Sequence, residues 1–195
     1  MPTGIRLIVG LGNPGDKYDQ TRHNAGAWFV EQLAAADHIQ LQAEPKFQGK
    51  VGALTLVTQK VWLLLPTTFM NASGQSVRAM SQFYQIPPES ILVAHDELDF
   101  PAGVVRLKQE GGHGGHNGLR DLIAHLQTDR FMRLRIGIGH PGHRSQVLDY
   151  VLNRPSKADF EKIMDGIQLA ANVLPDLIAG QTQQAIQKLH DQPGS

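Results

Sequence analysis

The sequence contains no cysteine among its 195 residues. Disulfide bonds, thiolate metal sites and a cysteine nucleophile are therefore excluded. No uninterrupted apolar run reaches the roughly 18 residues that a transmembrane helix needs. The N-terminus also lacks a basic segment followed by an apolar one. We therefore expect no membrane segment and no signal peptide, which is compatible with a protein of the reducing cytoplasm.

The sequence has no net charge, because 18 Lys and Arg balance 18 Asp and Glu. Overall charge therefore gives no indication of a nucleic-acid partner. The local distribution differs, since residues 104–145 contain seven Lys or Arg against three Asp or Glu. The hydrophobic content of 41% is typical of a globular protein. The length predicts a single domain over residues 1–195, large enough to bury a sizeable core.

Apolar runs alternate with amphipathic segments along the chain, which predicts an α/β fold. The continuous or alternating apolar patterns predict strands at 5–9, 48–58, 60–65, 91–94, 104–109 and 133–139. The second and third are expected to pair through a tight turn near Gln59. Helical spacing predicts helices at 25–36, at 73–84, after Asn117 and from 156 to 178, with a kink at Pro175 and a short final helix.

Polar residues follow three of the expected strands. Asn13, Asn71 and Asp96 each come at or just after the end of an apolar run. In open α/β sheets, ligands bind at the carboxyl ends of the strands. The repetition therefore predicts one site along one sheet edge, and the polar segment before the first helix adds His23 to it.

Three other kinds of site remain open at this point. Gly10-x-Gly12-x-x-Gly15 follows a strand and matches a dinucleotide fingerprint, but about nine polar residues separate it from the expected helix. The pairs His113 with His116 and His140 with His143 suggest a metal site, or else loop histidines that bond to backbone groups. A serine hydrolase is disfavoured because no Gly-x-Ser-x-Gly segment is present.

The remaining polar residues suit general-base chemistry. A histidine can take a proton from water near neutral pH, and a carboxylate can orient it and stabilise its charged form. Amide side chains can both donate and accept, so they can hold a carbonyl or a water. His23, Asp96, Asn13, Asn71 and Asn117 form such a set, although each could singly be a turn or helix-cap residue.

Five motifs together resemble the bacterial peptidyl-tRNA hydrolase family. They are Gly10-Leu-Gly-Asn-Pro-Gly15, Thr21-Arg-His-Asn24, Pro66-Thr-Thr-Phe-Met-Asn71, His95-Asp-Glu97 and Gly112-His-Gly-Gly-His-Asn-Gly118. The resemblance extends over essentially the whole chain, and it is weakest at residues 40–60 and in the last fifteen. It implies a single α/β domain with a twisted mixed central sheet flanked by helices. It also implies a cytoplasmic monomer that hydrolyses the ester between a peptide and the 3′ end of tRNA, without metal or cofactor.

The resemblance also implies roles for individual residues. His23 matches the general base, Asp96 its orienting partner, and Asn13 the residue that distinguishes N-blocked from free aminoacyl-tRNA. The implied substrate-binding residues are Tyr18, Phe69, Met70, Asn71 and Asn117. Lys108 and Arg135 resemble a clamp on the tRNA 5′-phosphate.

The basic stretch offers an independent reason to expect a phosphate contact. Residues two apart on a strand share a face, so Arg106 and Lys108 should point the same way, as should Arg133 and Arg135. If the two strands are neighbours, four cations form one ridge beside the glycine-rich loop. The same stretch would also suit a non-catalytic RNA-binding module, and the glycine fingerprint leaves a cofactor-dependent dehydrogenase as a further alternative.

Overall fold

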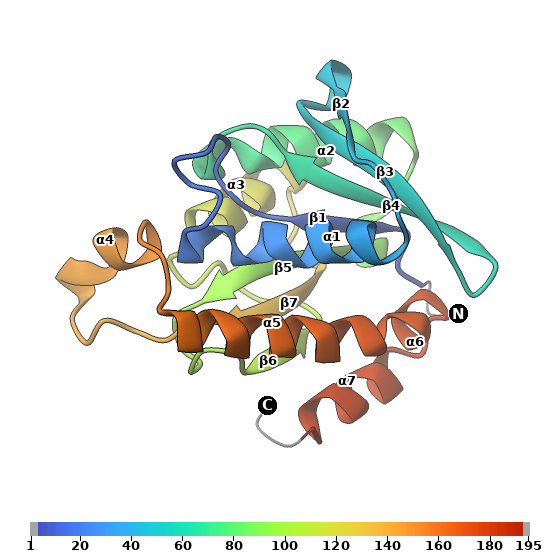
Figure 1. The fold of residues 1–195 in the computed structure, drawn as a ribbon. Helices are drawn as coiled ribbons and strands as arrows, with labels where there is room; N and C mark the ends of the chain where they lie inside the picture. The colour runs from blue at the N-terminus through green and yellow to red at the C-terminus, as the bar shows by residue number, and fades with distance from the viewer. Residues whose placement is uncertain (1–3, 193–195) are drawn as a thin grey trace.

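One seven-stranded sheet forms the centre of the molecule (Figure 1). The structure, a computed structural model, describes residues 4–192. The strands are β1 (Leu7–Gly10), β2 (Gln42–Glu44), β3 (Gly49–Leu56), β4 (Gln59–Pro66), β5 (Ile91–Glu97), β6 (Val105–Lys108) and β7 (Met132–Gly137). Their order is β2-β3-β4-β1-β5-β7-β6. The four central strands are parallel and the outer pairs are antiparallel, so the prediction of a single α/β domain with a mixed sheet is confirmed.

Helices cover both faces of the sheet. They are α1 (Ala25–Ala36), α2 (Ser73–Phe83), α3 (Asn117–Leu126), α4 (Val147–Val151), α5 (Lys157–Asn172), α6 (Leu174–Ile178) and α7 (Thr182–His190). Side chains alternate between faces along a strand, so Ile8 packs with α1 and α5–α7 while Leu7 and Val9 pack with α2 and α3. Figure 1 shows the resulting three layers, with α1 and α5 in front of the sheet. No helix within residues 4–192 is long and apolar enough to cross a bilayer.

The parallel pairing brings the predicted polar residues to one edge. β1 lies between β4 and β5, with Val9 opposite both Leu64 and Val93. The carboxyl ends of these three strands therefore meet, as expected from the sequence. Asp96 lies within β5, which continues to Glu97, rather than in the loop beyond it.

Several predicted boundaries were wrong. The strand predicted to reach Thr58 ends at Leu56, because the hairpin turn lies at Val57 and Thr58, which both have positive φ, next to the expected position near Gln59. The expected long helix from 156 to 178 is two helices, because α5 ends before Val173. Pro175 lies in the first turn of α6, where its missing N–H has no intrahelical acceptor to lose, so it begins a helix rather than kinking one. The short elements β2 and α4 were not predicted.

Candidate active site

A cleft of about 1030 Å³ opens at the carboxyl ends of β5 and β7. Its floor contains His23, Asp96 and His116, and its walls include the glycine-rich loop before α3 and residues of α4. Lys108, Arg135 and Asn117 also line it. The cleft thus combines the expected base and carboxylate with both residues of the expected phosphate clamp.

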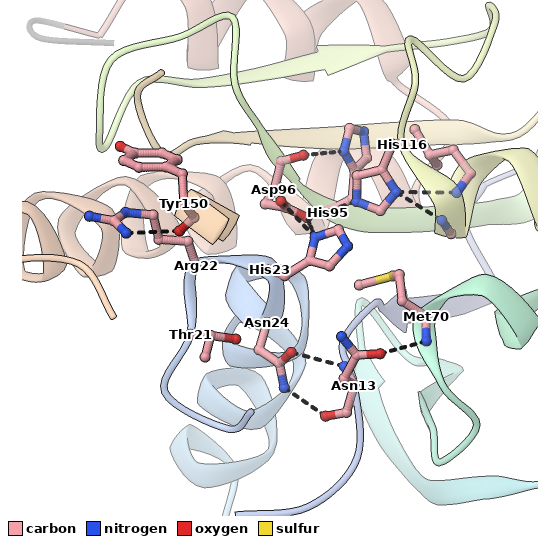
Figure 2. A network of polar contacts seen from close by, with 12 residues as sticks. Asn13, Thr21, Arg22, His23, Asn24, Met70, His95, Asp96, His116 and Tyr150 are labelled. Atoms are coloured by element: carbon pink, nitrogen blue, oxygen red, sulfur yellow. Dashed lines mark hydrogen bonds and ion pairs between the residues drawn. The ribbon is translucent and has the colours of Figure 1, made fainter. Parts of the chain in front are cut away.

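Asp96 holds two histidines at once (Figure 2). Nδ1 of His23 lies 2.9 Å from Oδ2 and 3.0 Å from Oδ1 of Asp96, and Nε2 of His116 lies 2.7 Å from Oδ1. Because an ionised carboxylate can only accept, both ring nitrogens carry a proton and donate to it. In the neutral form of His23, Nε2 is therefore unprotonated and points away from Asp96, which is the form a general base requires.

The protonation of His116 is fixed by a second set of contacts. Its Nδ1 accepts from the backbone N–H of Gly118 at 3.1 Å and of Leu119 at 3.3 Å, so His116 is the N-cap of α3. An accepting Nδ1 leaves the ring proton on Nε2, where it points at Asp96. From the sequence, His116 was predicted only as a possible metal ligand or loop residue, and its role as a helix cap bonded to Asp96 was not predicted. Its place one residue before an amphipathic helix was the available signal.

The electrostatics of the pair follow from burial and proximity. Burial by itself lowers the pKa of His23, but the charge of Asp96 and its hydrogen bond outweigh burial and raise this pKa above the ordinary value. Burial raises the pKa of Asp96, but His23 and His116 outweigh it and hold the pKa of this carboxyl well below its usual range. Asp96 is therefore ionised throughout the neutral range.

His95 lies beside these residues, but its ring bonds to the backbone of Asp96 and not to its carboxylate. Its Nδ1 donates to the carbonyl oxygen of Asp96 at 2.8 Å, and its Nε2 has no partner within the described chain. Burial, together with the nearness of His116 and Arg133, lowers the pKa of His95 to about 3. His95 is therefore neutral and serves as a packing residue behind the site.

Hydrogen bonds from neighbouring residues fix Asn13 and leave its side-chain NH₂ group as an available donor (Figure 2). The side chain of Asn24 accepts from the backbone N–H of Asn13 and donates to its carbonyl, both at 2.9 Å. The Oδ1 of Asn13 accepts from the N–H of Met70 at 2.7 Å. This contact fixes the amide orientation, and Nδ2 has no acceptor among residues 4–192. Asn13 therefore presents an N–H donor beside the cleft.

Of the other residues predicted to bind the 3′ end of the substrate, Asn117 lines the cleft, whereas Tyr18, Phe69, Met70 and Asn71 do not. Phe69 is 60% exposed, and its ring meets that of Tyr18 edge to face at 6.4 Å. Met70 is buried, while Asn71 is exposed in the turn that precedes α2. Asn117 is exposed at the first position of α3, where its Oδ1 accepts from Arg120 at 3.3 Å.

The predicted ridge of four cations is only partly present. β6 and β7 are neighbours, with Arg106 opposite Arg135 and Lys108 opposite Arg133, so all four side chains share a face as expected. Lys108 is exposed, and Arg135 is half-buried with its Nε 2.9 Å from Glu97. Arg133 is only 2% exposed, so its expected place on an exposed ridge was wrong. The glycine-rich loop covers it.

The hydrogen bonds of the cleft residues argue against a metal site there. His23, Asp96 and His116 offer three ligand atoms within 4.8 Å of one another. To ligate through Nε2, however, His116 would have to move its proton to Nδ1, which faces two N–H donors. The set therefore fits a hydrogen-bonded network better than a metal. The other candidate loop ligands, His113 and His140, each accept from a nearby glycine N–H at 2.9 Å.

The glycines of the apparent dinucleotide fingerprint have packing roles instead. A Cβ on Gly10 would lie 2.5 Å from the carbonyl oxygen of Gly26, and one on Gly12 would lie 2.8 Å from the side chain of Asn24. These glycines let α1 approach β1 closely. Because α1 begins only at Ala25, the glycine turn does not run directly into a helix, as the dinucleotide fingerprint requires.

Comparisons with known proteins agree over nearly the full length. A family model described as peptidyl-tRNA hydrolase matches residues 7–194. A peptidyl-tRNA hydrolase of Pseudomonas paraeruginosa is 58% identical over 191 residues, covering 97% of this chain and 98% of that protein. One from Methylococcus capsulatus is 56% identical over 186 residues, covering 95% and 99%. The crystal structure of peptidyl-tRNA hydrolase from Acinetobacter baumannii superposes with a TM-score of 0.94 at 51% identity, covering 98% and 97% of the two chains.

Proposed function

This chain belongs to the peptidyl-tRNA hydrolase family, and from that membership we propose that it hydrolyses the ester between a peptide and the 3′ end of tRNA. The products are free tRNA and the released peptide. The observation that carries the proposal, beyond the family itself, is His23 held by a buried carboxylate with its second nitrogen free.

In this mechanism His23 is the general base. Its Nε2 takes a proton from water as the oxygen attacks the ester carbonyl, while Asp96 stabilises the imidazolium that forms. The ester C–O bond then breaks, and the proton on His23 passes to the 3′ oxygen of the tRNA as it leaves. His116 keeps Asp96 oriented by donating to its other oxygen. No metal is needed, because the base is formed by side chains alone.

Amide groups hold the substrate beside this base. The Nδ2 of Asn13 can donate to a peptide carbonyl, which an N-blocked substrate offers and a free aminoacyl group lacks. Asn71 and Asn117 are exposed amides suited to position the ester and stabilise its charged intermediate. Phe69 and Tyr18 form an adjacent surface on which the unpaired bases at the tRNA end can stack. The buried Met70 contributes through its backbone N–H, which holds Asn13. Lys108 and Arg135 contact the tRNA 5′-phosphate.

The direct test is incubation with N-acetyl-aminoacyl-tRNA. We expect release of free tRNA and N-acetyl amino acid, at the same rate with or without 1,10-phenanthroline, a chelator of transition metals that leaves Mg²⁺ for the tRNA. Loss of turnover with the chelator would contradict the metal-free mechanism. Binding without turnover would favour the alternative of a non-catalytic RNA-binding module.

Two further properties implied by the family resemblance stay predictions. We propose that the protein acts as a monomer and in the cytoplasm, where its substrate is made. Sedimentation of the purified protein and fractionation of cells that produce it check these two properties.

A further inference from the structure

Arg133 is the largest fully buried side chain and makes an unusual set of contacts. From β7 its guanidinium reaches three backbone carbonyls, those of Gly111, Gly112 and Asp129. The bond to Gly112 is 2.6 Å and that to Asp129 is 3.1 Å. The guanidinium carbon also lies 4.5 Å from the centre of the Phe131 ring.

A buried cation normally needs a carboxylate to offset its loss of hydration. Within residues 4–192, Arg133 has no ion pair at hydrogen-bonding distance, although the charge of Asp129 acts on it from farther away. Its donors instead meet three backbone carbonyls, which an apolar residue would leave without partners. The arrangement therefore indicates that the position requires several donors in a fixed planar array.

The carbonyls that Arg133 binds belong to the segment that leads into the site. Gly111 and Gly112 open the loop that ends in His116 and Asn117, four and five residues after Gly112. Gly111 has φ +143°, and Lys108 packs directly over it. Between Gly112 and His116 the loop is mostly glycine, and a Cβ on Gly112, Gly114 or Gly115 would touch nothing within 4 Å. Arg133 is thus the side chain that fixes the start of an otherwise loosely packed loop.

We propose that Arg133 is a positioning residue for hydrolysis, which anchors the glycine-rich loop and so holds His116 against Asp96. This inference rests on the proposed function and deepens it. Its effect reaches the base through one chain of contacts, from the loop to His116, from His116 to Asp96 and from Asp96 to His23. Arg133 itself touches no reacting atom.

The expected signature follows from the titratable and charged groups around Asp96. His23 and His116 contact its carboxylate, the neutral His95 lies beside it, and the cationic Arg133 lies near His95. When the loop shifts, the His116 donor moves away from Asp96. The carboxylate then stabilises the protonated form of His23 more strongly, which raises the pKa of His23. The acid limb of the pH–rate profile should then move to higher pH, by about half a unit, since hydrogen bonds to charged groups are worth about one unit or more. Misplacing His116 and Asn117 should also lower kcat by about 10- to 100-fold.

The test compares Arg133→Lys with Arg130→Lys, an exposed arginine on the same segment. A lysine keeps the charge but cannot span three carbonyls. We expect Arg133→Lys to lower kcat equally on N-acetyl-aminoacyl-tRNA and on a small ester that mimics only its 3′ end. The acid limb of the pH–rate profile should move to higher pH for both substrates. The downfield NMR signal of the His116 Nε2 proton should weaken through faster exchange. Arg130→Lys should behave as the wild type in every measurement.

A second variant reaches the same loop without altering Arg133. Gly111 has φ +143°, a backbone conformation that strains any residue with a Cβ, so Gly111→Ala should shift the loop and reproduce the same profile if Arg133→Lys fails to fold. A raised KM for tRNA alone would mean that Arg133 contacts phosphate, and would overturn the proposal. Reduced stability together with an unchanged pH–rate profile and an unchanged His116 Nε2 proton signal would also overturn the proposal. The NMR signal is independent of turnover, so failure of the proposed function would be recognised separately.

Discussion

The substitution Asp96→Asn should trap His23 in the wrong tautomer. Asp96 accepts from Nδ1 of His23 and from Nε2 of His116. An asparagine puts a donating NH₂ group in place of one carboxylate oxygen; because Oδ1 contacts both rings and Oδ2 contacts His23, at least one ring N–H then faces a donor. His116 cannot adapt, because its Nδ1 caps α3 by accepting two N–H groups. The asparagine oxygen should therefore face His116, and its NH₂ group should face His23.

The consequence for catalysis can be given as a magnitude. A donating NH₂ group forces His23 to accept at Nδ1 and to carry its proton on Nε2, which abolishes the base. The equivalent change in serine proteases lowers kcat by about 10⁴ through the same tautomer error, and we expect a similar loss here. Any remaining activity should show its acid limb at lower pH, because no carboxylate stabilises the imidazolium.

The assay is single-turnover hydrolysis of N-acetyl-aminoacyl-tRNA between about pH 5 and pH 9, with ¹⁵N NMR of the His23 ring to report its tautomer. Asp176→Asn is a matched control, since Asp176 pairs with Lys188 and does not line the cleft. Turnover within about tenfold of the wild type, with the Nδ1–H tautomer retained, would refute the reasoning.

Three more predictions follow from the same geometry. Asn13→Asp keeps the acceptor for Met70 but replaces the free donor with an oxygen, so the ratio of kcat/KM for N-blocked over free aminoacyl-tRNA should fall; an unchanged ratio would assign discrimination elsewhere. Lys108→Ala combined with Arg135→Ala should reduce the slope of log affinity for tRNA against log salt by about 0.7 to 0.9 per contact. Small esters should react as before, and equal losses on both substrates would contradict a phosphate role. The pKa of His95 is about 3, below its unfolded value, so the unfolded chain binds the proton first as pH falls below about 6.5. As the pH falls, the free energy of unfolding should therefore decrease more steeply in the wild type than in His95→Asn, by up to about 1.4 kcal/mol per pH unit. Urea unfolding at several pH values measures this difference, and equal pH slopes for the two proteins would refute the assignment.

That the site residues lie together at one edge of the sheet could be predicted from the sequence, because their positions depend on strand periodicity. Apolar runs in β1, β4 and β5 must pair within the sheet, and parallel strands present their carboxyl ends together. Asn13 and Asp96 therefore came to one edge without any knowledge of loop conformation. The helix α1 was predicted over its whole length for the same reason, since Trp28, Phe29 and Leu33 show its buried face.

The contacts that orient these residues could not be predicted in this way. Strand alternation placed Arg133 and Arg135 on one face correctly, but it could not show that the glycine-rich loop folds back over Arg133 and buries it while Arg135 stays partly exposed. His116 acquires its role from the helix that follows and from Asp96, which is 20 residues away. Such roles depend on loop conformation, which glycine leaves open in the sequence.

The most direct test of the central claim is the turnover of His23→Gln on N-acetyl-aminoacyl-tRNA. The exposed His38 provides the matched control His38→Gln. If His23 is the general base, His23→Gln should lower kcat by about 10² to 10⁴ while tRNA affinity and thermal stability stay at the wild-type level. A His23→Gln enzyme that folds, binds tRNA and turns over near the wild-type rate would contradict the claim.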